Sequence, residues 1–499
     1  MDLFFTIKRE KIRFMIIFAE IMKKLVILSL ISIAAFLTGC SLDEDFNWPQ
    51  GGRITCSCDT VSFDTVFSAI GSATQRFLIY NKESKAVRLP QIKLASGGSS
   101  GFRVNIDGIS GTSFQDVEIN HEDSIWVFVE VTVDPHDQDS PILITDSLVI
   151  SQPNGVTECV VLTAWGQDVI IKRGEHITTD ASFDAKRPYV VYDSLVVDSG
   201  VVLTIKPGVT LCFHEGADMR IKGNIVAEGT PEQPIIFRGD RTDRLFSYLP
   251  YDRTDGQWGG IQLFNITRRC DNVFKCCDIH GGNYGVKSLM GSEPVTLQII
   301  GTTIHNVHGH GLDLKYGKAY IENSQITNTF GNCVNIIGGL TQFYYTTIAQ
   351  FYPWDAERGH AVYFANIEDS LAFPLHELTF TNCIITGYGK DEMYGTRYAP
   401  QEGENDVDFN YAFKYSLVLT DTTTVEQEHY TGCVFDVDTT FSKTKNFKTI
   451  DTKNYVYNFE LDSISKARHI GINIPNVQTD KNGYSRPAAN TDAGCYQYR

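Results

Sequence analysis

Polar residues whose chemistry could serve a function recur between residues 310 and 363. The segments H-G-L-D-L, N-C-V-N-I and H-A-V-Y-F begin at His310, Asn332 and His360 and share one alternation. Side chains alternate between the two faces of a strand, so the third and fifth residues of each segment face inward and the fourth faces outward. The sequence therefore predicts an outward row on adjacent strands, which consists of His310, Asp313, Asn335, His360 and Tyr363.

A short insertion after the second segment adds aromatic and charged side chains. Residues 351–359 read F-Y-P-W-D-A-E-R-G, and we expect them to overhang the row. Aromatic rings cover the apolar faces of sugars, while polar groups bond to the hydroxyls. We therefore predict a carbohydrate-binding site with the binding residues Trp354, Tyr363, Asn335 and Arg358.

The same surface contains groups that suit acid–base catalysis. Glycoside hydrolysis needs two carboxylates, about 5–5.5 Å apart for retention or 6.5–9.5 Å for inversion. A lyase needs instead a base of lowered pKa. The candidate catalytic residues are Asp313, Asp355, Glu357, His310 and His360. The sequence leaves open whether the protein is an enzyme, because polar residues of a strand also face solvent without doing chemistry.

A repeat along the chain would position this row. Triplets with a small first residue and a large apolar third residue occur at Cys277–Ile279, Thr302–Ile304, Ser324–Ile326, Thr346–Ile348, Cys383–Ile385 and Cys433–Phe435. Their third residues lie 25, 22, 22, 37 and 50 residues apart. Such a period predicts stacked coils, each burying its inner face against its neighbours, with larger gaps as inserted loops. The first residues, including the cysteines, should stack as small buried side chains. Asn306, Asn328 and Gln350 each lie two positions after the inward isoleucine, and this column suits a repeated tight bend because asparagine tolerates left-handed backbone.

Motifs before and after these coils resemble a known family. L-T-I-K-P-G-V-T-L-C-F, I-x-G-N-I-V-A-E-G-T and P-I-I-F, within residues 189–237, resemble the opening coils of right-handed parallel β-helix proteins of the pectin-lyase-like group. The resemblance implies an all-β fold and no particular reaction. The segments D-K-N-G-Y-S-R-P and T-D-A-G-C-Y-Q-Y resemble the closing segment of bacterial β-helix proteins. We therefore expect a β-helix over residues 168–447 and a cap on its last coil over residues 448–499.

One branch of that family offers a catalytic signature for comparison. Polygalacturonase-like members have N-T-D before G-H-G. Here Gly309-His310-Gly311 is present, but Asn490-Thr491-Asp492 is the only N-T-D and follows it. The pattern is broken, so no catalytic residue of that branch can be assigned to this chain.

Residues 54–167 have a different pattern. Seven or eight short alternating runs, separated by breaks such as Gly97-Gly98, predict an antiparallel immunoglobulin-like sandwich. This part resembles the modules found at the N-terminus of exported bacterial proteins. Of the 12 cysteines in the chain, Cys56, Cys58 and Cys159 could include one disulfide.

The first 53 residues carry export signals. Met22-Lys23-Lys24 is basic, residues 25–37 are apolar and Leu37-Thr38-Gly39-Cys40 follows. This pattern predicts a signal peptide over residues 1–40, with Met22 as the true start. The L-T-G-C sequence resembles the lipoprotein box, which implies lipidation of Cys40. Residues 41–53 form an acidic tether that resembles the surface-export signal of Bacteroidetes lipoproteins. We expect an exported protein, lipid-anchored to the outer membrane and exposed at the cell surface.

The net charge and the positions of possible metal ligands limit which partners and cofactors the chain is expected to bind. The net charge of −17 argues against nucleic acid. No metal site is expected, because His308 and His310 share one bend and the cysteines are predicted to be buried. Calcium is the one cofactor left open, at the acidic insertion that contains Asp391, Glu392, Arg397, Glu402, Glu404, Asp406 and Asp408. We interpret the chain as a surface protein that binds a polysaccharide or a protein partner without catalysis. The alternative is a polysaccharide hydrolase or lyase.

Overall fold

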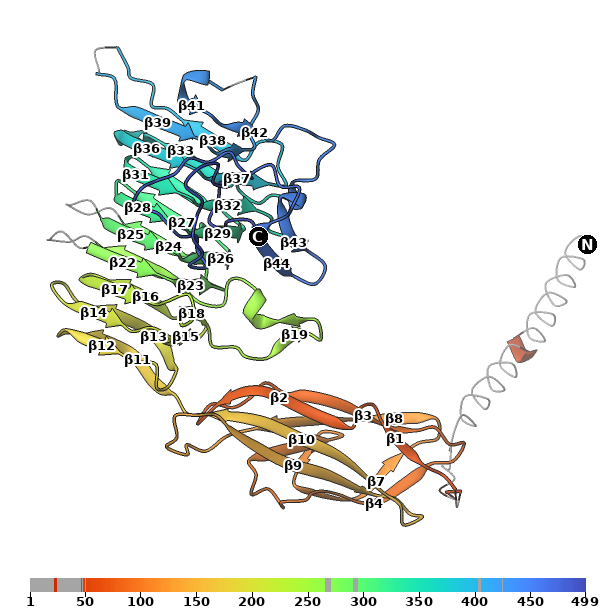
Figure 1. Ribbon diagram of the computed structural model, residues 1–499. Helices are drawn as coiled ribbons and strands as arrows, with labels where there is room; N and C mark the ends of the chain where they lie inside the picture. The colour runs from red at the N-terminus through yellow and green to blue at the C-terminus, as the bar shows by residue number, and fades with distance from the viewer. Residues whose placement is uncertain are drawn as a thin grey trace, which may run out of the picture. The chain divides into compact units, whose positions relative to one another are not determined.

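Nearly all regular structure among the described residues is β (Figure 1). The computed structural model describes residues 22–24, 46, 48–49, 51–264, 271–289, 295–402, 405–423 and 425–499. No helix in these ranges has the length and apolar character that a membrane crossing requires. The chain divides into two compact units, the first containing Gln75–Val129 and Asp146–Leu162 and the second containing Ser62–Thr74, Glu130–Thr145 and Thr163–Arg499.

The N-terminal strands form two five-stranded sheets. In spatial order, one contains β1 (Ile54–Cys56), β3 (Gln75–Asn81), β8 (Asp123–Val131), β5 (Phe102–Ile106) and β6 (Ile109–Gly111). The other contains β2 (Thr60–Phe67), β10 (Thr157–Gln167), β9 (Ile142–Ser151), β4 (Val87–Leu94) and β7 (Ser113–Ile119). The pairs β3–β8 and β4–β7 are antiparallel, as predicted. Buried and exposed residues alternate along β2 and β4, so each of these strands has one apolar face.

Most strands after residue 169 stack in parallel and form three ladders, apart from the antiparallel pairs of β19 (Arg244–Phe246) with β20 (Leu249–Pro250), β34 (Ile367–Glu368) with β35 (Leu371–Ala372) and β43 (Phe447–Asp451) with β44 (Val456–Leu461). Ladder A contains β15 (Thr210–Phe213), β18 (Ile235–Gly239), β23 (Cys277–His280), β26 (Thr303–Val307), β29 (Gln325–Thr329), β32 (Thr347–Gln350), β37 (Ile384–Gly387), β40 (Leu417–Val418) and β42 (Val434–Phe435). Ladder B contains β16 (Asp218–Ile221), β21 (Ile261–Phe264), β24 (Val286–Leu289), β27 (Leu312–Lys315), β30 (Val334–Ile337), β33 (Val362–Ala365) and β38 (Met393–Thr396). Ladder C contains β12 (Ala181–Phe183), β14 (Val202–Ile205), β17 (Asn224–Glu228), β22 (Asp271–Lys275), β25 (Thr296–Ile300), β28 (Lys318–Glu322), β31 (Gly339–Tyr344), β36 (Leu375–Thr381), β39 (Phe409–Lys414) and β41 (Tyr430–Thr431).

Ladders A and B share one 18-stranded sheet, in which the long β13 (Tyr189–Val197) pairs with both β15 and β16. The strand β11 (Ile170–Ile177) pairs with β13 at the edge of this sheet. The chain passes from ladder C to ladder A, then to ladder B and back to ladder C. This arrangement is consistent with a parallel β-helix.

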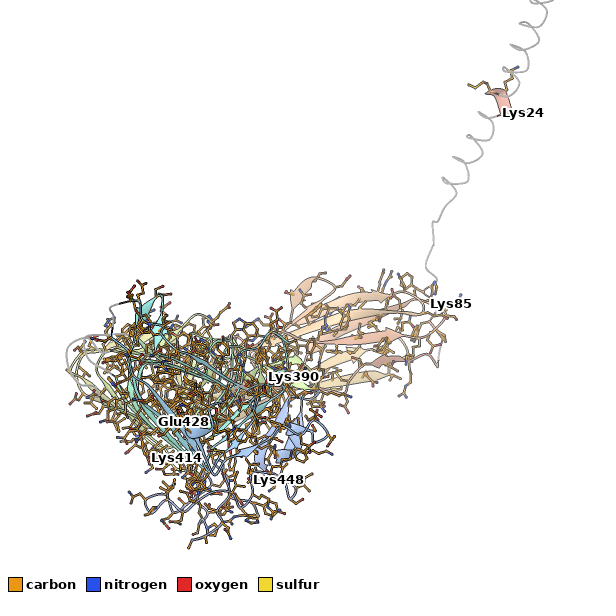
Figure 2. All side chains as sticks on the ribbon, turned by 90° about the horizontal axis from the view of Figure 1, so that it is seen from above. Lys24, Lys85, Lys390, Lys414, Glu428 and Lys448 are labelled. Carbon is orange, nitrogen blue, oxygen red and sulfur yellow. The ribbon has the colours of Figure 1, made fainter. Side chains whose placement is uncertain are left out.

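The predicted register of the coils is confirmed. Ile279 pairs with Ile304, Ile304 with Ile326, and Ile326 with Ile348 along ladder A. All four side chains are fully buried and belong to one apolar core cluster. Figure 2 shows the side chains of the described residues on the ribbon. Side chains alternate between the two faces of a strand, so every second residue of these strands must be apolar where one face is buried.

One coil was missed in the sequence. The 50-residue gap between Ile385 and Phe435 contains β40, whose Val418 pairs with both of these residues. Ser416 takes the small position before β40 and accepts a hydrogen bond from Cys383 N at 2.9 Å. This coil escaped detection because its strand has only two residues and Val418 stands where earlier coils have isoleucine.

Left-handed backbone marks the bends between ladders. Asn306 and Asn328, with φ of 49° and 57°, lie near the ends of β26 and β29, where the chain leaves ladder A, as predicted. Gln350, expected at the equivalent bend, has no left-handed φ. A second column of left-handed residues lies between ladders C and A. The sequence did not reveal it, because no single residue type is common to all of its members. It consists of Cys276, Gly301, Asn323, Tyr345, Asn382, Tyr415 and Gly432.

None of the described cysteines is in a disulfide. Cys56, Cys58 and Cys159 are all free, so the bridge left open for them is absent. Cys277 and Cys383 are buried in the small column, as predicted, whereas Cys433 is only partly buried. Burial raises the pKa of the Cys383 thiol to about 12, which keeps it protonated and unreactive. Cys40 lies outside the described residues.

The C-terminal residues 447–499, here called the closing segment, lie along the outer face of ladder A. They include the hairpin of β43 (Phe447–Asp451) and β44 (Val456–Leu461). Phe459 and Ala493 belong to one apolar cluster with the outward residues Ala349, Ile384 and Leu417 of ladder A. The segment was expected to cover the end of the β-helix. It covers the side instead, because the outward residues of these strands are apolar and need burial.

Candidate functional site

The outer face of ladder A changes character along the stack. The strands β32, β37 and β40 carry the apolar outward residues that the closing segment covers. The outward residues of β23, β26 and β29 are polar, namely Asp278, His280, Thr303, His305, Gln325 and Thr327. They line a cavity of about 480 Å³, here called the ladder A groove.

Two segments add side chains to this groove. Tyr455, Tyr457 and Tyr496 come from the closing segment. Asp252 and Arg253 come from the 3₁₀ turn η1 (Tyr251–Arg253), within the insertion between β18 and β21 that also contains β19 (Arg244–Phe246) and β20 (Leu249–Pro250). Arg253 Nη1 donates a hydrogen bond to Asn454 O at 3.0 Å, so the insertion and the hairpin touch. Aromatic rings therefore meet a polar strand surface in this groove.

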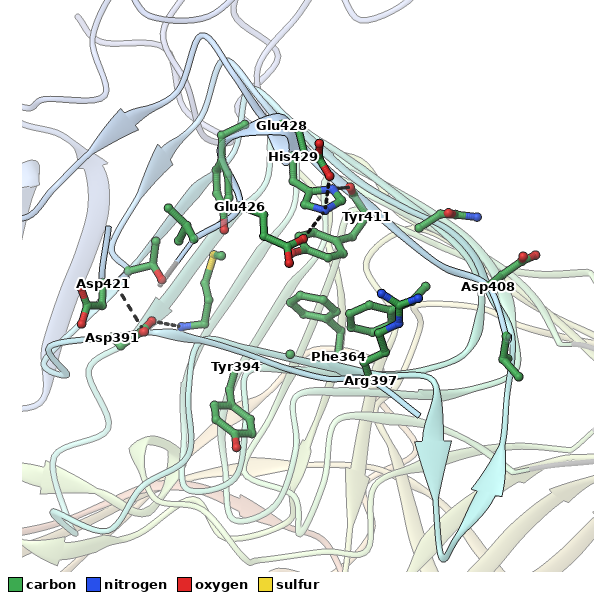
Figure 3. A pocket seen from close by; sticks show the side chains of 18 of the residues that line it. Phe364, Asp391, Tyr394, Arg397, Asp408, Tyr411, Asp421, Glu426, Glu428 and His429 are labelled. Carbon is green, nitrogen blue, oxygen red and sulfur yellow. Dashed lines mark hydrogen bonds and ion pairs between the residues drawn. The ribbon is translucent and has the colours of Figure 1, made fainter. Parts of the chain in front are cut away.

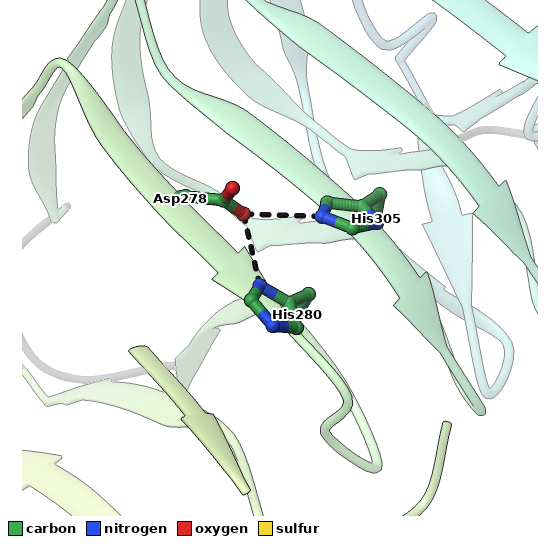
Figure 4. Close-up of side chains that lie close together, drawn as sticks. All are labelled: Asp278, His280 and His305. Carbon is green, nitrogen blue, oxygen red and sulfur yellow. Dashed lines mark hydrogen bonds and ion pairs between the residues drawn. The ribbon is translucent and has the colours of Figure 1, made fainter. Parts of the chain in front are cut away.

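The floor of the groove contains a cluster of two histidines and two aspartates. Asp278 Oδ1 lies 2.9 Å from His280 Nδ1 and 3.1 Å from His305 Nε2. The other ring nitrogen of His280, Nε2, lies 2.9 Å from Asp252 Oδ1. Arg238 Nη2 in turn lies 2.9 Å from that oxygen. Figure 4 shows both imidazole rings directed at the Asp278 carboxylate.

Charge pairing dominates the ionisation of this cluster. Burial favours neutral His280, but Asp278 and Asp252 outweigh it and raise the His280 pKa to about 9. Burial likewise opposes ionisation of Asp252, but His280 and Arg238 lower its pKa to about 2. The Asp278 pKa lies well below its ordinary value because of His280 and His305. Near neutral pH the cluster therefore holds ionised carboxylates against a protonated His280.

Two polar atoms at the groove have no hydrogen-bond partner among the described residues. Asn328 is 1% exposed, and its side-chain Oδ1 is buried without a donor. The Tyr457 hydroxyl is also buried and unpaired. Both residues line the groove. An unpaired buried polar atom is costly, so these two atoms reduce the stability of the fold at this place.

The predicted row on ladder B exists, but its centre is buried. Asp313, Asn335 and Tyr363 are in register on β27, β30 and β33. Asn335 Nδ2 donates to Asp313 Oδ1 at 2.7 Å, and the two residues are 7% and 5% exposed. The carboxylate and the amide are therefore used mainly for stacking between coils.

Hydrogen bonds to Asn332 on the neighbouring coil hold both histidines beside this row. Asn332 N donates to His310 Nδ1 at 2.8 Å, and His360 N donates to Asn332 Oδ1 at 2.9 Å. Burial lowers the His310 pKa, although Asp313 partly opposes the shift. Asn332 Nδ2 also donates to Asn335 Oδ1 at 3.3 Å, so His310, Asn335 and Asp313 belong to one network. His360 joins this network only through its backbone N, and its imidazole Nδ1 lies 3.3 Å from Asp391 O.

The 351–359 insertion makes its ring contacts away from this row. Trp354 stacks on Tyr455 with ring centroids 4.5 Å apart, and Arg358 lies 4.9 Å from the Tyr388 ring centroid. Asp355 Oδ1 accepts a hydrogen bond from Glu357 N within the loop, where both residues are exposed. These contacts do not place the insertion over the row on ladder B, as was expected. Trp354 instead contacts Tyr455, which lines the ladder A groove.

The acidic insertion lines a second cavity, of about 790 Å³, at the last coils (Figure 3). This cavity is here called the end cavity. Its charged residues have separate partners: Arg397 pairs with Asp406 at 2.7 Å, and Asp408 with His376 at 2.8 Å. Glu404 lies outside the described residues. The remaining lining includes Phe364, Asp391, Tyr394, Tyr411, Asp421, Glu426, Glu428 and His429. This cavity forms where the stack of coils ends and inner rings such as Phe364 have fewer coils to cover them.

The ladder A cluster was missed although its signal is in the sequence. The alternation that places Ile279 and Ile304 inward places Asp278, His280 and His305 outward. Only the inward positions of those strands were considered. The remaining members, Asp252 and Arg238, could not be found in this way because the insertion has no repeat.

Comparison with known proteins adds little. The chain matches no family model and no curated protein. One similar solved structure, a family 123 glycoside hydrolase from Clostridium perfringens, is 7% identical over 23% of this chain and 26% of that chain. Another, the PapD-like domain 7 of human CEP192, is 10% identical over 26% of this chain and 95% of that one. The TM-score is 0.17 for both, so neither carries an argument about fold or function.

Proposed function

We propose that the protein binds a polysaccharide in the ladder A groove. The observation that carries this proposal is the meeting of aromatic rings with a polar strand surface in one cavity of about 480 Å³. Tyr455, Tyr457 and Tyr496 offer rings for the apolar faces of sugars, while the strands offer hydroxyl, amide, imidazole and carboxylate groups. Trp354 is 40% exposed and stacks on Tyr455, which extends the ring surface.

The ring stack should dominate the affinity for glycan. We expect the full chain to be retarded in affinity gels cast with at least one plant or host polysaccharide. Tyr455→Ala and Trp354→Ala should each weaken binding about tenfold, because a ring stack contributes roughly 0.5–1.5 kcal/mol beyond its buried area. Tyr394→Ala is the matched control, since Tyr394 lines the end cavity instead. Unchanged binding after both groove substitutions, or loss only after Tyr394→Ala, would contradict the proposal.

A second candidate is cleavage of the bound polysaccharide. Asp252 and Asp278 lie on opposite ring nitrogens of His280 in the same groove, so two carboxylates are available beside the glycan. Assays for new reducing ends and for unsaturated products distinguish a hydrolase from a lyase. Binding without either product supports the non-catalytic function.

We also propose that the protein is exported and anchored to the outer membrane through lipidated Cys40. The L-T-G-C sequence supports this proposal. In cells, Cys40→Ser should move the protein from the membrane fraction to the soluble fraction, and an unchanged distribution would refute the anchor. Right-handed pectin-lyase-like coils and an immunoglobulin-like class for the N-terminal sheets are finer proposals, which an experimental structure would test.

A further inference from the structure

The fold gathers three metal-ligand side chains on two neighbouring coils. Asp278 and His280 project from the same face of β23, and His305 projects from β26 in register with His280. Their ligand atoms all lie within 4.8 Å of one another. The two distances to Asp278 Oδ1 are 2.9 and 3.1 Å. Ligands bind such an ion at about 2.0–2.2 Å, so side-chain atoms this close together can bind one ion after a small adjustment.

The surroundings orient the ligands as they do in metal sites. Asp252 Oδ1 lies 2.9 Å from His280 Nε2, so Nε2–H can donate a hydrogen bond to it. The ion would then replace the proton on Nδ1, which is released to water on binding. Arg238 Nη2 lies 2.9 Å from Asp252 Oδ1 and forms an ion pair with this carboxylate. A carboxylate behind a ligating histidine fixes both the tautomer and the direction of the ring.

The site is both supported and accessible. The His280 side chain is 7% exposed, whereas those of Asp278 and His305 are 37% and 25% exposed. The open side faces the ladder A groove, whose lining includes all three side chains. Three protein ligands with an open position are typical of sites that also bind water or another ligand.

We propose that Asp278, His280 and His305 bind one divalent first-row transition ion, such as Zn²⁺. Two imidazole nitrogens favour such an ion over Ca²⁺, which takes oxygen ligands. The expectation of no metal considered His308 and His310, whereas the strand register selects different histidines. This site does not depend on the proposed glycan.

Calorimetric titration of the full chain with Zn²⁺, after treatment with EDTA and without glycan, tests the proposal. We expect one ion per chain, and Co²⁺ should give visible absorption bands. His305→Ala and Asp278→Asn should each weaken Zn²⁺ binding at least tenfold. Asp252→Asn should weaken it about 10–100-fold by releasing His280. Circular dichroism of each variant establishes that the coils are intact.

His429→Ala is the matched control. His429 belongs to a second group with Glu426 and Glu428, which is exposed at the end cavity. We expect this variant to bind Zn²⁺ like the wild type. Absence of binding by the wild type would overturn the proposal. Binding that survives His305→Ala and Asp278→Asn, or that is lost with His429→Ala, would overturn it as well.

Discussion

Replacement of Phe351 by alanine should release the closing segment from ladder A. Phe351 is fully buried at the end of β32. Its ring lies 6.0 Å from Phe447 and 6.2 Å from Phe459, both in the closing segment. Removing a buried phenylalanine costs about 3–5 kcal/mol, because transfer free energy is lost and a cavity remains. Amide exchange of β44 should therefore become at least 100-fold faster, since each 1.4 kcal/mol is about tenfold.

The same substitution should weaken glycan binding without altering any residue that lines the groove. Tyr455, Tyr457 and Tyr496 are in the closing segment, so its release removes the ring surface from the groove. Tyr316→Ala is the control, because this ring is 38% exposed and lies outside the closing segment. Hydrogen exchange with mass spectrometry measures both variants. Equal protection of β44 in Phe351→Ala and the wild type would show that the segment is held by other contacts.

Stability should fall as pH rises from about 4.5 to 7 because of Glu392. This residue is 2% exposed, and its carboxylate accepts hydrogen bonds from Gly389 N at 2.6 Å and Ala361 N at 3.0 Å. Burial raises its pKa from 4.5 to about 7, although the two backbone groups and Arg358 partly oppose the shift. Between these values the folded protein holds a proton that the unfolded chain has lost. The free energy of unfolding should therefore decrease by on the order of 3 kcal/mol across this range.

Glu392→Gln isolates this contribution. Glutamine does not titrate, so the variant should lack this part of the pH dependence. Its Nε2 cannot accept the hydrogen bond that one of the two backbone N–H groups donates to the carboxylate, so the variant should be less stable than the wild type at pH 4.5. Glu357→Gln is the control, because Glu357 is exposed. Thermal unfolding from pH 4.5 to 8 measures all three proteins. Parallel curves for Glu392→Gln and the wild type would contradict the assignment.

Local regularity decided what the sequence could predict. The inward column of Ile279, Ile304 and Ile326 was predictable because stacked strands place equivalent residues over one another. The burial of Asp313 was not, since it depends on Asn335 in the next coil. The position of the closing segment could also not be predicted from local sequence patterns. Its contacts join residues far apart in sequence, as when Cys495 N donates to Thr347 Oγ1 at 3.1 Å.

The course of the closing segment constrains how this chain can change in length. Its hydrogen bonds reach Gly301 through Lys481, Asn323 through Thr479 and Asn382 through Ile472. An extra turn inserted between these anchor points would shift them apart by about 4.8 Å and break the bonds. Duplications or deletions of whole turns between Gly301 and Asn382 would therefore break these bonds, so the spacing of these turns is fixed.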